Sequence, residues 1–390
     1  MLQTPERGFA PSEYEQRAQR AQQAMELAGM DALLLTTHAD IFYFSGFLTQ
    51  FWQSPTRPWF LLIPQSGKPV AVIPTIGVEC MQRTWLNDIR SWSSPNEHDD
   101  GMGLLISTIK ELCGASPNLA VPMGHETYLR LPLNSIMQLQ KAFATNTPWL
   151  DATQLIRDVR AIKSEHEIDK IRYACSIASN AFARVPSYDL AGRNEIDLFR
   201  QFKISCLELG ADECAYLVGA SGPDGYTDVI SPATGRQLRA GDIFILDTGC
   251  VWDGYHCDFD RNFAVGRASD AATSAYQTLW DATQQGIESI KPGVSCADLF
   301  QVMMNAMAGA DGGSVGRIGH GLGIDLTEPP SLTSYDTTVL KTGMVMTLEP
   351  GLNYGNGLTM VHEENIVIRD SGAELLSVRA AQQLPICQRI

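Results

Sequence analysis

The stretch "IFILDTGCVWDGYHCDFDRNFAVG", residues 243–266, decides the fold of the second half of this 390-residue chain. Two apolar runs flank the dipeptide Asp253–Gly254, which is typical of the tight turn of a β-hairpin. A hairpin places Asp247 and Asp258 on facing strands, within reach of one ion. Either aspartate alone is explained by a turn or a surface charge. As a pair at the ends of apolar strands they indicate a site, because aspartate is rare in strands and costly to bury without a partner.

Two later segments repeat this pattern with glutamates. In "GMVMTLEPGLNY", residues 343–354, Glu349 ends an apolar run. In "MVHEENIVI", residues 360–368, Glu363 and Glu364 precede another apolar run. Because adjacent strand residues face opposite sides, one of this pair is predicted to point inward and the other outward. His320, between glycines in "RIGHGLGIDLTEPPSL", completes a set of carboxylates with one imidazole.

The charge of this set indicates bound metal. Four inward carboxylates repel one another unless positive charge compensates them, and two divalent ions neutralise four carboxylates. Aspartate, glutamate and one histidine are ligand types suited to Mn²⁺, Co²⁺, Fe²⁺ or Zn²⁺. The residue types therefore favour a two-ion centre that activates water and polarises a carbonyl. Scattered structural acids are the alternative.

The amino-acid composition limits the kinds of partner that the protein can bind. Acidic residues outnumber basic ones 44 to 29, giving a formal net charge of −15, which disfavours nucleic acid and anionic membranes as partners. The first residues, "MLQTPERGFAPSEYEQR", lack the apolar segment of a signal peptide, and the apolar runs elsewhere are strand-sized. The nine scattered cysteines form no C-x-x-C pair and predict free or buried thiols. We therefore expect a cytoplasmic protein.

The pattern along the chain predicts two domains, with residues 1–150 as the first and 151–390 as the second. Strand-like runs alternate with helical ones in the first half, which is typical of a small α/β domain. Ser12 and Glu15 are predicted to cap its first helix, and "IFYFSGF", residues 41–47, resembles a strand. Ser164 and Glu167 predict a capping box at the start of the second domain, which is expected to be α+β with an antiparallel sheet.

Several motifs resemble those of the creatinase/prolidase/methionine aminopeptidase family, whose catalytic domain has the pita-bread fold. These motifs are "LDTG", "GYHCDFDRNF", "GHGLG", "TLEPGL" and "VHEENIVI", together with "IKSEHEIDKIR" and, in the first domain, "YFSGF". The resemblance covers nearly the whole chain. It implies an α/β N-terminal domain, an α+β pita-bread catalytic domain and a homodimer. It also implies five metal ligands, at Asp247, Asp258, His320, Glu349 and Glu363.

The sequence departs from the family at its auxiliary histidines. Peptidases of the family usually carry a histidine seven residues after the ligand histidine, where this chain has Thr327. A second lies upstream, near Ile230 or Ser231 here, and prolidase-type members often have a third at the position of Gly316. In the family these histidines bind the substrate carbonyl or move protons. Their replacement argues against ordinary peptidase chemistry and leaves the metal ligands intact.

Five residues are candidates for contacting substrate. Trp52 and Trp59 either pack in a loop between strands or hold a cationic group by cation–π contact, in the active site of a partner subunit. Tyr226 and Asp228 lie where a histidine is missing and either anchor substrate or are solvated loop residues. Thr327 occupies the position seven residues after His320, where the family usually has a histidine.

Three functions are compatible with these residues. The first is a metal-dependent hydrolase resembling Xaa-Pro aminopeptidase and prolidase, in which a dinuclear centre activates water on an amide bond of a small peptide. There Glu349 handles the proton of the water, and His320 contributes as a ligand. The second is a metal-dependent lyase on a small zwitterionic carboxylate such as dimethylsulfoniopropionate, which the missing histidines and "LTEPPS" motivate. The third is a non-catalytic binding protein with the same fold, against which the intact ligand set argues.

Overall fold

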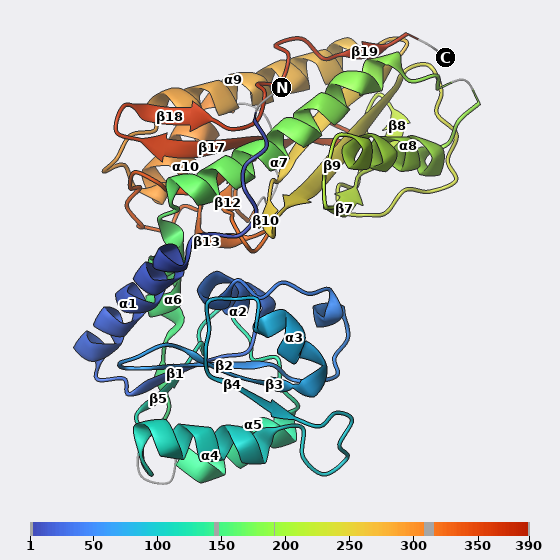
Figure 1. The fold of residues 1–390 in the computed structure, drawn as a ribbon. Helices are drawn as coiled ribbons and strands as arrows, with labels where there is room; N and C mark the ends of the chain where they lie inside the picture. Colours follow the sequence, from blue (N-terminus) through green and yellow to red (C-terminus); the bar gives the residue numbers. More distant parts are fainter. Residues whose placement is uncertain (1–2, 144–147, 191, 308–315, 389–390) are drawn as a thin grey trace. The chain divides into compact units, whose positions relative to one another are not determined.

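The chain folds into two compact units (Figure 1). The computed structural model describes residues 3–143, 148–190, 192–307 and 316–388. One unit comprises Glu6–Arg160, and the other comprises Met1–Pro5 and Ala161–Ile390. The division falls after Arg160 rather than at the predicted residue 150, since Leu150 and Asp151 pair with the sheet of the first unit. Among the described residues, no helix is both long and apolar enough to cross a membrane.

The first unit is built on one six-stranded mixed sheet with the order β4-β3-β2-β1-β5-β6. Figure 1 shows α4 and α5 on one face of this sheet, and α2 and α3 on the other. This arrangement confirms the predicted α/β class. The strands are β1 (Ala32–Leu35), β2 (Phe60–Pro64), β3 (Val70–Pro74), β4 (Ile89–Trp92), β5 (Leu119–Val121) and β6 (Leu150–Asp151). The helices are α1 (Pro11–Ala28), α2 (His38–Ser45), α3 (Val78–Met81), α4 (Met102–Cys113), α5 (Leu133–Phe143) and α6 (Thr153–Ala161).

The start of α1 corrects one prediction. The helix begins at Pro11, and its N-cap is Ala10, which makes no side-chain capping bond. The predicted capping box of Ser12 and Glu15 is therefore wrong. Proline at the first helical position supplies a fixed helical φ and needs no backbone donor, so the helix can begin there without a polar cap.

The segment "IFYFSGF" is also not a strand. Its first five residues end α2, which begins when the Thr37 side chain accepts a hydrogen bond from the Asp40 backbone N–H. Every residue from Ala39 to Ser45 is buried. A helix buried on all sides shows no helical periodicity in its sequence, and a short apolar run then resembles a strand.

The second unit contains two mainly antiparallel sheets, as predicted. In the first, β10-β9-β11-β19 are neighbours and β7 and β8 also pair with β9; in the second, the order is β13-β12-β14-β17-β18. A separate hairpin joins β15 and β16. The strands are β7 (Glu213–Val218), β8 (Ser221–Pro223), β9 (Asp242–Trp252), β10 (Tyr255–His256), β11 (Phe259–Val265), β12 (His320–Gly321), β13 (Glu328–Ser331), β14 (Val345–Leu348), β15 (Gly351–Asn353), β16 (Thr359–Val361), β17 (Glu364–Arg369), β18 (Gly372–Leu375) and β19 (Ile386–Cys387).

Four α-helices lie among the described residues of the second unit. Helix α7 begins with the predicted capping box, in which Ser164 and Glu167 bond reciprocally. Figure 1 shows α7 and α8 close to β9 and β7, whereas α9 and α10 lie beside each other on the side of β17 and β18. The pita-bread expectation is thereby confirmed. The helices are α7 (Glu165–Arg184), α8 (Glu195–Glu208), α9 (Asp270–Ser289) and α10 (Cys296–Ala306).

The hairpin predicted at residues 243–266 is present. Asp253 and Gly254 have φ of 48° and 80°, and Trp252 pairs with Tyr255 across them. Two left-handed residues in a two-residue loop form the turn that matches the twist of antiparallel strands. The ladder between β9 and β11 runs from Phe259 opposite Thr248 to Ala264 opposite Ile243, with Asp260 opposite Asp247. Asp258 directly precedes β11 and is therefore close to Asp247.

Candidate metal centre

The five predicted ligands converge in the second unit. One carboxylate oxygen each from Asp247, Asp258 and Glu363 lies within 4.8 Å of the other two. His320 Nε2 is 3.3 Å from Asp258 Oδ2 and 3.7 Å from Glu349 Oε1. The sequence therefore predicted which side chains gather here, although they are up to 116 residues apart, from Asp247 to Glu363.

Strand register explains how the two glutamates meet. Leu348 at the end of β14 lies opposite Glu364 at the start of β17. One step further along this antiparallel register brings Glu349 and Glu363 together, just outside the ladder. The Glu349 backbone N–H donates to Ile318 O at 3.0 Å, which ties this end of β14 to the segment that carries His320.

Contacts with Thr347, Gly319 and Gly321 fix the position of His320. Its backbone N–H donates to Thr347 Oγ1 at 3.0 Å, and its Nδ1 is 2.8 Å from Gly321 O. Donation from Nδ1 to this carbonyl leaves Nε2 with a lone pair directed at the carboxylates, as in a metal-ligating imidazole. Gly319 has a φ of 146°, and a Cβ there would lie 2.4 Å from Thr347 O. A side chain at that position would push β12 away from β14.

The electrostatics of the cluster favour the binding of a cation. Burial, followed by the charge of Asp258, raises the pKa of both Asp247 and Glu363 well above the usual range. Burial also raises the pKa of Glu349 to about 7, although the charge of His320 opposes the rise. Burial lowers the pKa of His320, but the hydrogen bond to Asp258 and the charge of Glu349 outweigh burial and raise it.

Two buried carboxylate oxygens have no hydrogen-bond partner among the described residues: Glu363 Oε1 in the cluster, and Oδ2 of Asp260, which lies opposite Asp247. A buried carboxylate oxygen in this state carries a desolvation cost unless a cation or a proton meets it. The donor set, four carboxylates and one imidazole nitrogen, suits divalent first-row metal ions. The residues present therefore fit the predicted metal.

Neighbouring polar groups fix the ligand backbone. Asn365 forms two hydrogen bonds with the backbone of Asp258, accepting from its N–H at 2.9 Å and donating to its carbonyl. Arg261 donates to Glu363 O at 2.6 Å. These contacts join β11 to β17 behind the carboxylates. No local signal singles out Asn365 in the sequence, because its role depends on the pairing of distant strands.

Glu364 corrects the expectation that one of the adjacent glutamates points outward. It does face away from the cluster, but its side chain is 0% exposed. It pairs with Arg261 at 2.9 Å and with Arg379 at 3.1 Å, and Ala380 N–H donates to it at 2.8 Å. Burial alone would raise the pKa of Glu364, but the charge of Arg261 and a hydrogen bond from His362 hold it well below the usual range.

Tyr216 is a member of the site that sequence reasoning missed. Its hydroxyl is 2.9 Å from Asp247 Oδ1 and also contacts Asp258 Oδ1, so its one proton lies between two ligand carboxylates. Gly249 makes room for the ring, since a Cβ there would lie 2.4 Å from it. A register shift in β7 between Cys214 and Tyr216 sets the direction of the side chain. No sequence signal predicts such a bulge.

The two tryptophans are held within the first unit. Trp59 is 1% exposed, so it packs within the first unit, as the packing alternative predicts. Trp52 is half-buried, with its ring centroid 5.8 Å from that of Trp59. The Arg130 guanidinium lies over the Trp52 ring, 5.3 Å from its centroid. A cation of the protein itself therefore makes the cation–π contact that was predicted for a ligand.

The three remaining substrate candidates are placed differently from one another. Tyr226 is 2% exposed, and its hydroxyl donates to Asn262 Oδ1 at 2.6 Å, so it is a packing residue and not a solvated one. Asp228 is half-buried and accepts from the backbone of Ile230 at 2.8 Å, which stabilises its own loop. Thr327 is exposed in the loop that follows His320.

Comparison with known proteins agrees with this geometry. Residues 17–162 match the creatinase/prolidase N-terminal domain. A probable dipeptidase PepE of Mycobacterium tuberculosis is 27% identical over 374 residues, covering 94% of this chain and 95% of its own. A Xaa-Pro dipeptidase of Pyrococcus horikoshii is 26% identical, with 90% of this chain and 94% of its own covered.

A solved structure shows the same fold. The crystal structure of dipeptidase PepE from Mycobacterium ulcerans superposes with a TM-score of 0.84 at 26% identity, covering 97% of this chain and 99% of that one. Residues 169–370, more than half of the chain and including all five candidate ligands, match metallopeptidase family M24. The chain therefore belongs to metallopeptidase family M24, in the branch that resembles PepE and Xaa-Pro dipeptidases.

Proposed function

We propose that this protein is a metal-dependent peptidase that hydrolyses the amide bond of small peptides, with Xaa-Pro dipeptides as the first class to test. The observation that carries the proposal is the cluster of four carboxylates, two buried and two half-buried, in which Glu363 Oε1 has no partner among the described residues. The names of the relatives support a dipeptide substrate, because one is a probable dipeptidase and another a Xaa-Pro dipeptidase.

Two divalent ions, of manganese, cobalt, iron or zinc, would be held by the five converging side chains. Bound ions of this kind polarise a carbonyl group and lower the pKa of water. The five metal ligands would be Asp247, Asp258, His320, Glu349 and Glu363.

Glu349 is our candidate for accepting the proton of the attacking water. Its side chain is 21% exposed, whereas that of His320 is 4% exposed, so water reaches the glutamate more readily. His320 would act as a ligand whose orientation is set by Gly321 O. The role of Glu349 rests on its exposure to water, and the role of His320 rests on the orientation of its ring.

A lyase acting on a small zwitterionic carboxylate is the second candidate. It is favoured by the residues at the positions of the auxiliary histidines. Ile230, Gly316 and Thr327 are all exposed, and none of them can bind a carbonyl through an imidazole or exchange a proton near neutral pH. A base would instead remove a proton beside the substrate carboxyl group, with negative charge developing on that group.

An activity screen separates the two candidates. Protein reconstituted with Mn²⁺ is offered Xaa-Pro dipeptides, other dipeptides, creatine-like amides and dimethylsulfoniopropionate. We expect release of free amino acids from a dipeptide, and a loss of about 1,000-fold in Glu349→Gln. Glu288→Gln is the matched control, since Glu288 is an exposed residue of α9. Release of dimethyl sulfide with no dipeptide cleavage would establish the lyase instead.

We also propose a homodimer, on the family resemblance alone. Sedimentation velocity of the purified chain tests this directly. A single species of twice the mass of the 42.7 kDa chain supports the proposal, and a monomer at micromolar concentration contradicts it.

A further inference from the structure

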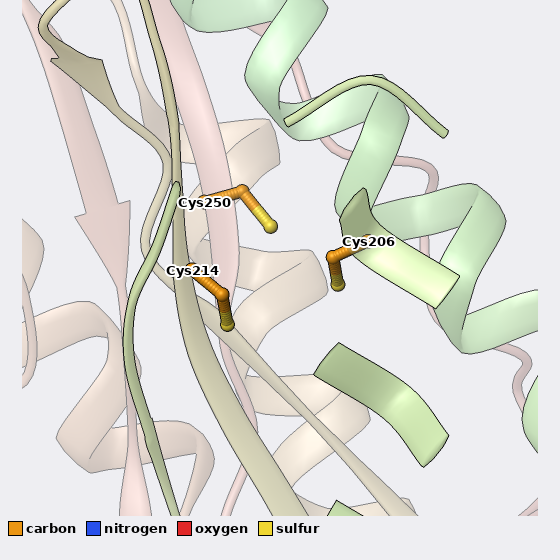
Figure 2. A group of neighbouring side chains, drawn as sticks. All are labelled: Cys206, Cys214 and Cys250. Atoms are coloured by element: carbon orange, nitrogen blue, oxygen red, sulfur yellow. The ribbon is translucent and has the colours of Figure 1, made fainter. Parts of the chain in front are cut away.

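A second cluster of metal-binding side chains lies in the same unit. Cys206 of α8, Cys214 of β7 and Cys250 of β9 bring their sulfur atoms within 4.8 Å of one another. Figure 2 shows the three side chains directed toward one another in the space between the two strands and the helix. None of the nine cysteines, all of which are described, takes part in a disulfide.

The register of β7 against β9 explains why the thiols meet. Cys214 lies opposite Cys250, and after the register shift Tyr216 lies opposite Gly249. Neighbouring positions of β9 face opposite sides of the sheet. The bulge at Ala215 therefore leaves Cys214 and Cys250 on the side of α8 and turns Tyr216 to the side of the carboxylate centre.

The surroundings of the thiols suit a soft cation. Cys206 and Cys250 are buried, whereas Cys214 is half-buried, so an ion has a route to the cluster at Cys214. Hydrogen bonds from the other two thiols and the positive charge of Lys203 lower the pKa of Cys214. Thr248 Oγ1 lies 3.2 Å from Cys214 Sγ and adds a polar atom at the edge of the cluster.

The spacing agrees with thiolate coordination. Zinc–sulfur bonds of about 2.3 Å in a tetrahedron put ligand sulfurs about 3.8 Å apart. Sulfurs already within 4.8 Å need only small side-chain movements to reach this distance. Thiolates select soft ions such as Zn²⁺ and Cu⁺, while the carboxylates of the other centre suit harder ones.

We propose that Cys206, Cys214 and Cys250 form a second metal site, for a soft thiophilic cation of the Zn²⁺ and Cu⁺ class, on the sheet face opposite the carboxylate centre. As each sulfur–metal bond forms, the thiol releases its proton to solvent, up to three protons for each ion. The bound ion joins α8 to β7 and β9 and fixes the bulge that directs Tyr216. The proposed thiol site does not rest on the proposed peptidase activity.

Thiolate-to-metal charge transfer tests the proposal without an activity assay. Reduced full-length protein is first filled with Mn²⁺, which prefers oxygen ligands, and is then titrated with Cd²⁺, a thiophilic probe. We expect a near-ultraviolet charge-transfer band that saturates at one Cd²⁺ per chain. The band should disappear in Cys206→Ser and in Cys250→Ser. It should remain in Cys113→Ser, a half-buried cysteine of the first unit, and in His320→Ala.

The outcome with His320→Ala separates the two sites. Loss of dipeptide cleavage with an unchanged Cd²⁺ band is expected there, because the imidazole belongs only to the carboxylate centre. Absence of the band in the wild-type protein, or its persistence in both cysteine variants, would overturn the thiol site.

Alkylation of the wild-type protein covers the case in which the variants do not fold. Stoichiometric Zn²⁺ added to Mn²⁺-filled protein should slow iodoacetamide labelling of Cys214 at least about 10-fold and leave Cys80, half-buried in the first unit, unaffected. Equal labelling rates with and without Zn²⁺ contradict the proposal. Formation of a disulfide among the three cysteines in air, with no protection by Zn²⁺, also contradicts it and indicates a redox pair.

Discussion

Glu363 and Glu364 are neighbours in sequence, and both are buried, with 2% and 0% of their surface exposed. Glu364 is the first residue of β17 and Glu363 directly precedes it, and their side chains point in opposite directions into opposite electrostatic environments. Arginines surround Glu364 and hold its pKa low, whereas carboxylates surround Glu363, and burial and those charges raise its pKa. Arginines of the protein itself neutralise Glu364, whereas we propose that bound metal ions neutralise Glu363.

This difference separates a structural cluster from a functional one. A buried charge costs several kcal/mol unless a partner offsets the cost, so a folded protein pairs its buried acids. The pairing of Glu364 with Arg261 and Arg379 meets that requirement. For the cluster around Glu363, we propose that divalent ions offset this cost. Four experiments test this difference, ordered by their expected effect on the free energy of unfolding.

The largest effect is expected at Arg261. Arg261→Met leaves Glu364 with one arginine in a fully buried position, and removes the donor to Glu363 O. We expect a loss of about 3–5 kcal/mol, measured from urea unfolding followed by circular dichroism. Arg200→Met is the matched control, because Arg200 is 66% exposed and lies 3.4 Å from Asp197. A loss below about 1 kcal/mol at Arg261 would mean that Glu364 does not need its cations.

Metal binding should have the next largest effect on the free energy of unfolding. A ligand that binds only the folded state at 100 times its Kd adds about 2.7 kcal/mol of stability. We expect the thermal midpoint of the second unit to rise when Mn²⁺ is added to chelator-treated protein, and to fall again with excess chelator. Glu363→Gln should show a much smaller rise. An equal rise in the variant would place the ions elsewhere.

The two glutamates should respond to the same substitution with opposite signs. In metal-free protein, Glu363→Gln removes one of several repelling carboxylates and should add about 1 kcal/mol of stability. Glu364→Gln breaks charged hydrogen bonds to arginine and should remove about 2 kcal/mol. Urea unfolding of the two metal-free variants beside wild type measures both changes. Destabilisation by both substitutions would show that the Glu363 cluster is paired within the protein.

The smallest effect is expected at Tyr216. Tyr216→Phe removes a hydroxyl that contacts two carboxylates, and should cost less than about 1 kcal/mol in metal-free protein. With Mn²⁺ bound, the carboxylates have ionic partners, so the cost should vanish. The difference between the two conditions is read from thermal melts of variant and wild type. A larger cost in the metal-bound state would indicate that the phenol contacts the ions.

Local signals in the sequence predicted much of this arrangement. The Asp253–Gly254 turn fixes the register of its own hairpin, so the proximity of Asp247 and Asp258 could be derived from a short stretch. The capping box at Ser164 was equally local. Where a buried segment has no periodicity, as in α2, the same reasoning took a helix for a strand.

The features that could not be predicted from the sequence depend on contacts between segments far apart in the chain. Alternation assigned Glu364 to the face opposite Glu363, but only the fold shows that two arginines cover that face. Tyr216 reaches Asp247 because of one bulge in β7, which also gathers three cysteines on the other side. Trp59 and Tyr226 were judged by residue type, and their burial in packed cores removed them from the substrate candidates.

The metal content of three proteins tests the central claim most directly. Wild type, Glu363→Gln and Glu364→Gln are stripped of metal, reconstituted with Mn²⁺, desalted and analysed by plasma mass spectrometry. We predict about two ions per chain in wild type and in folded Glu364→Gln, and at most about one in Glu363→Gln. Less than about half an ion per chain in wild type, or equal loss in both variants, would contradict the claim that the Glu363 cluster is a dinuclear metal centre.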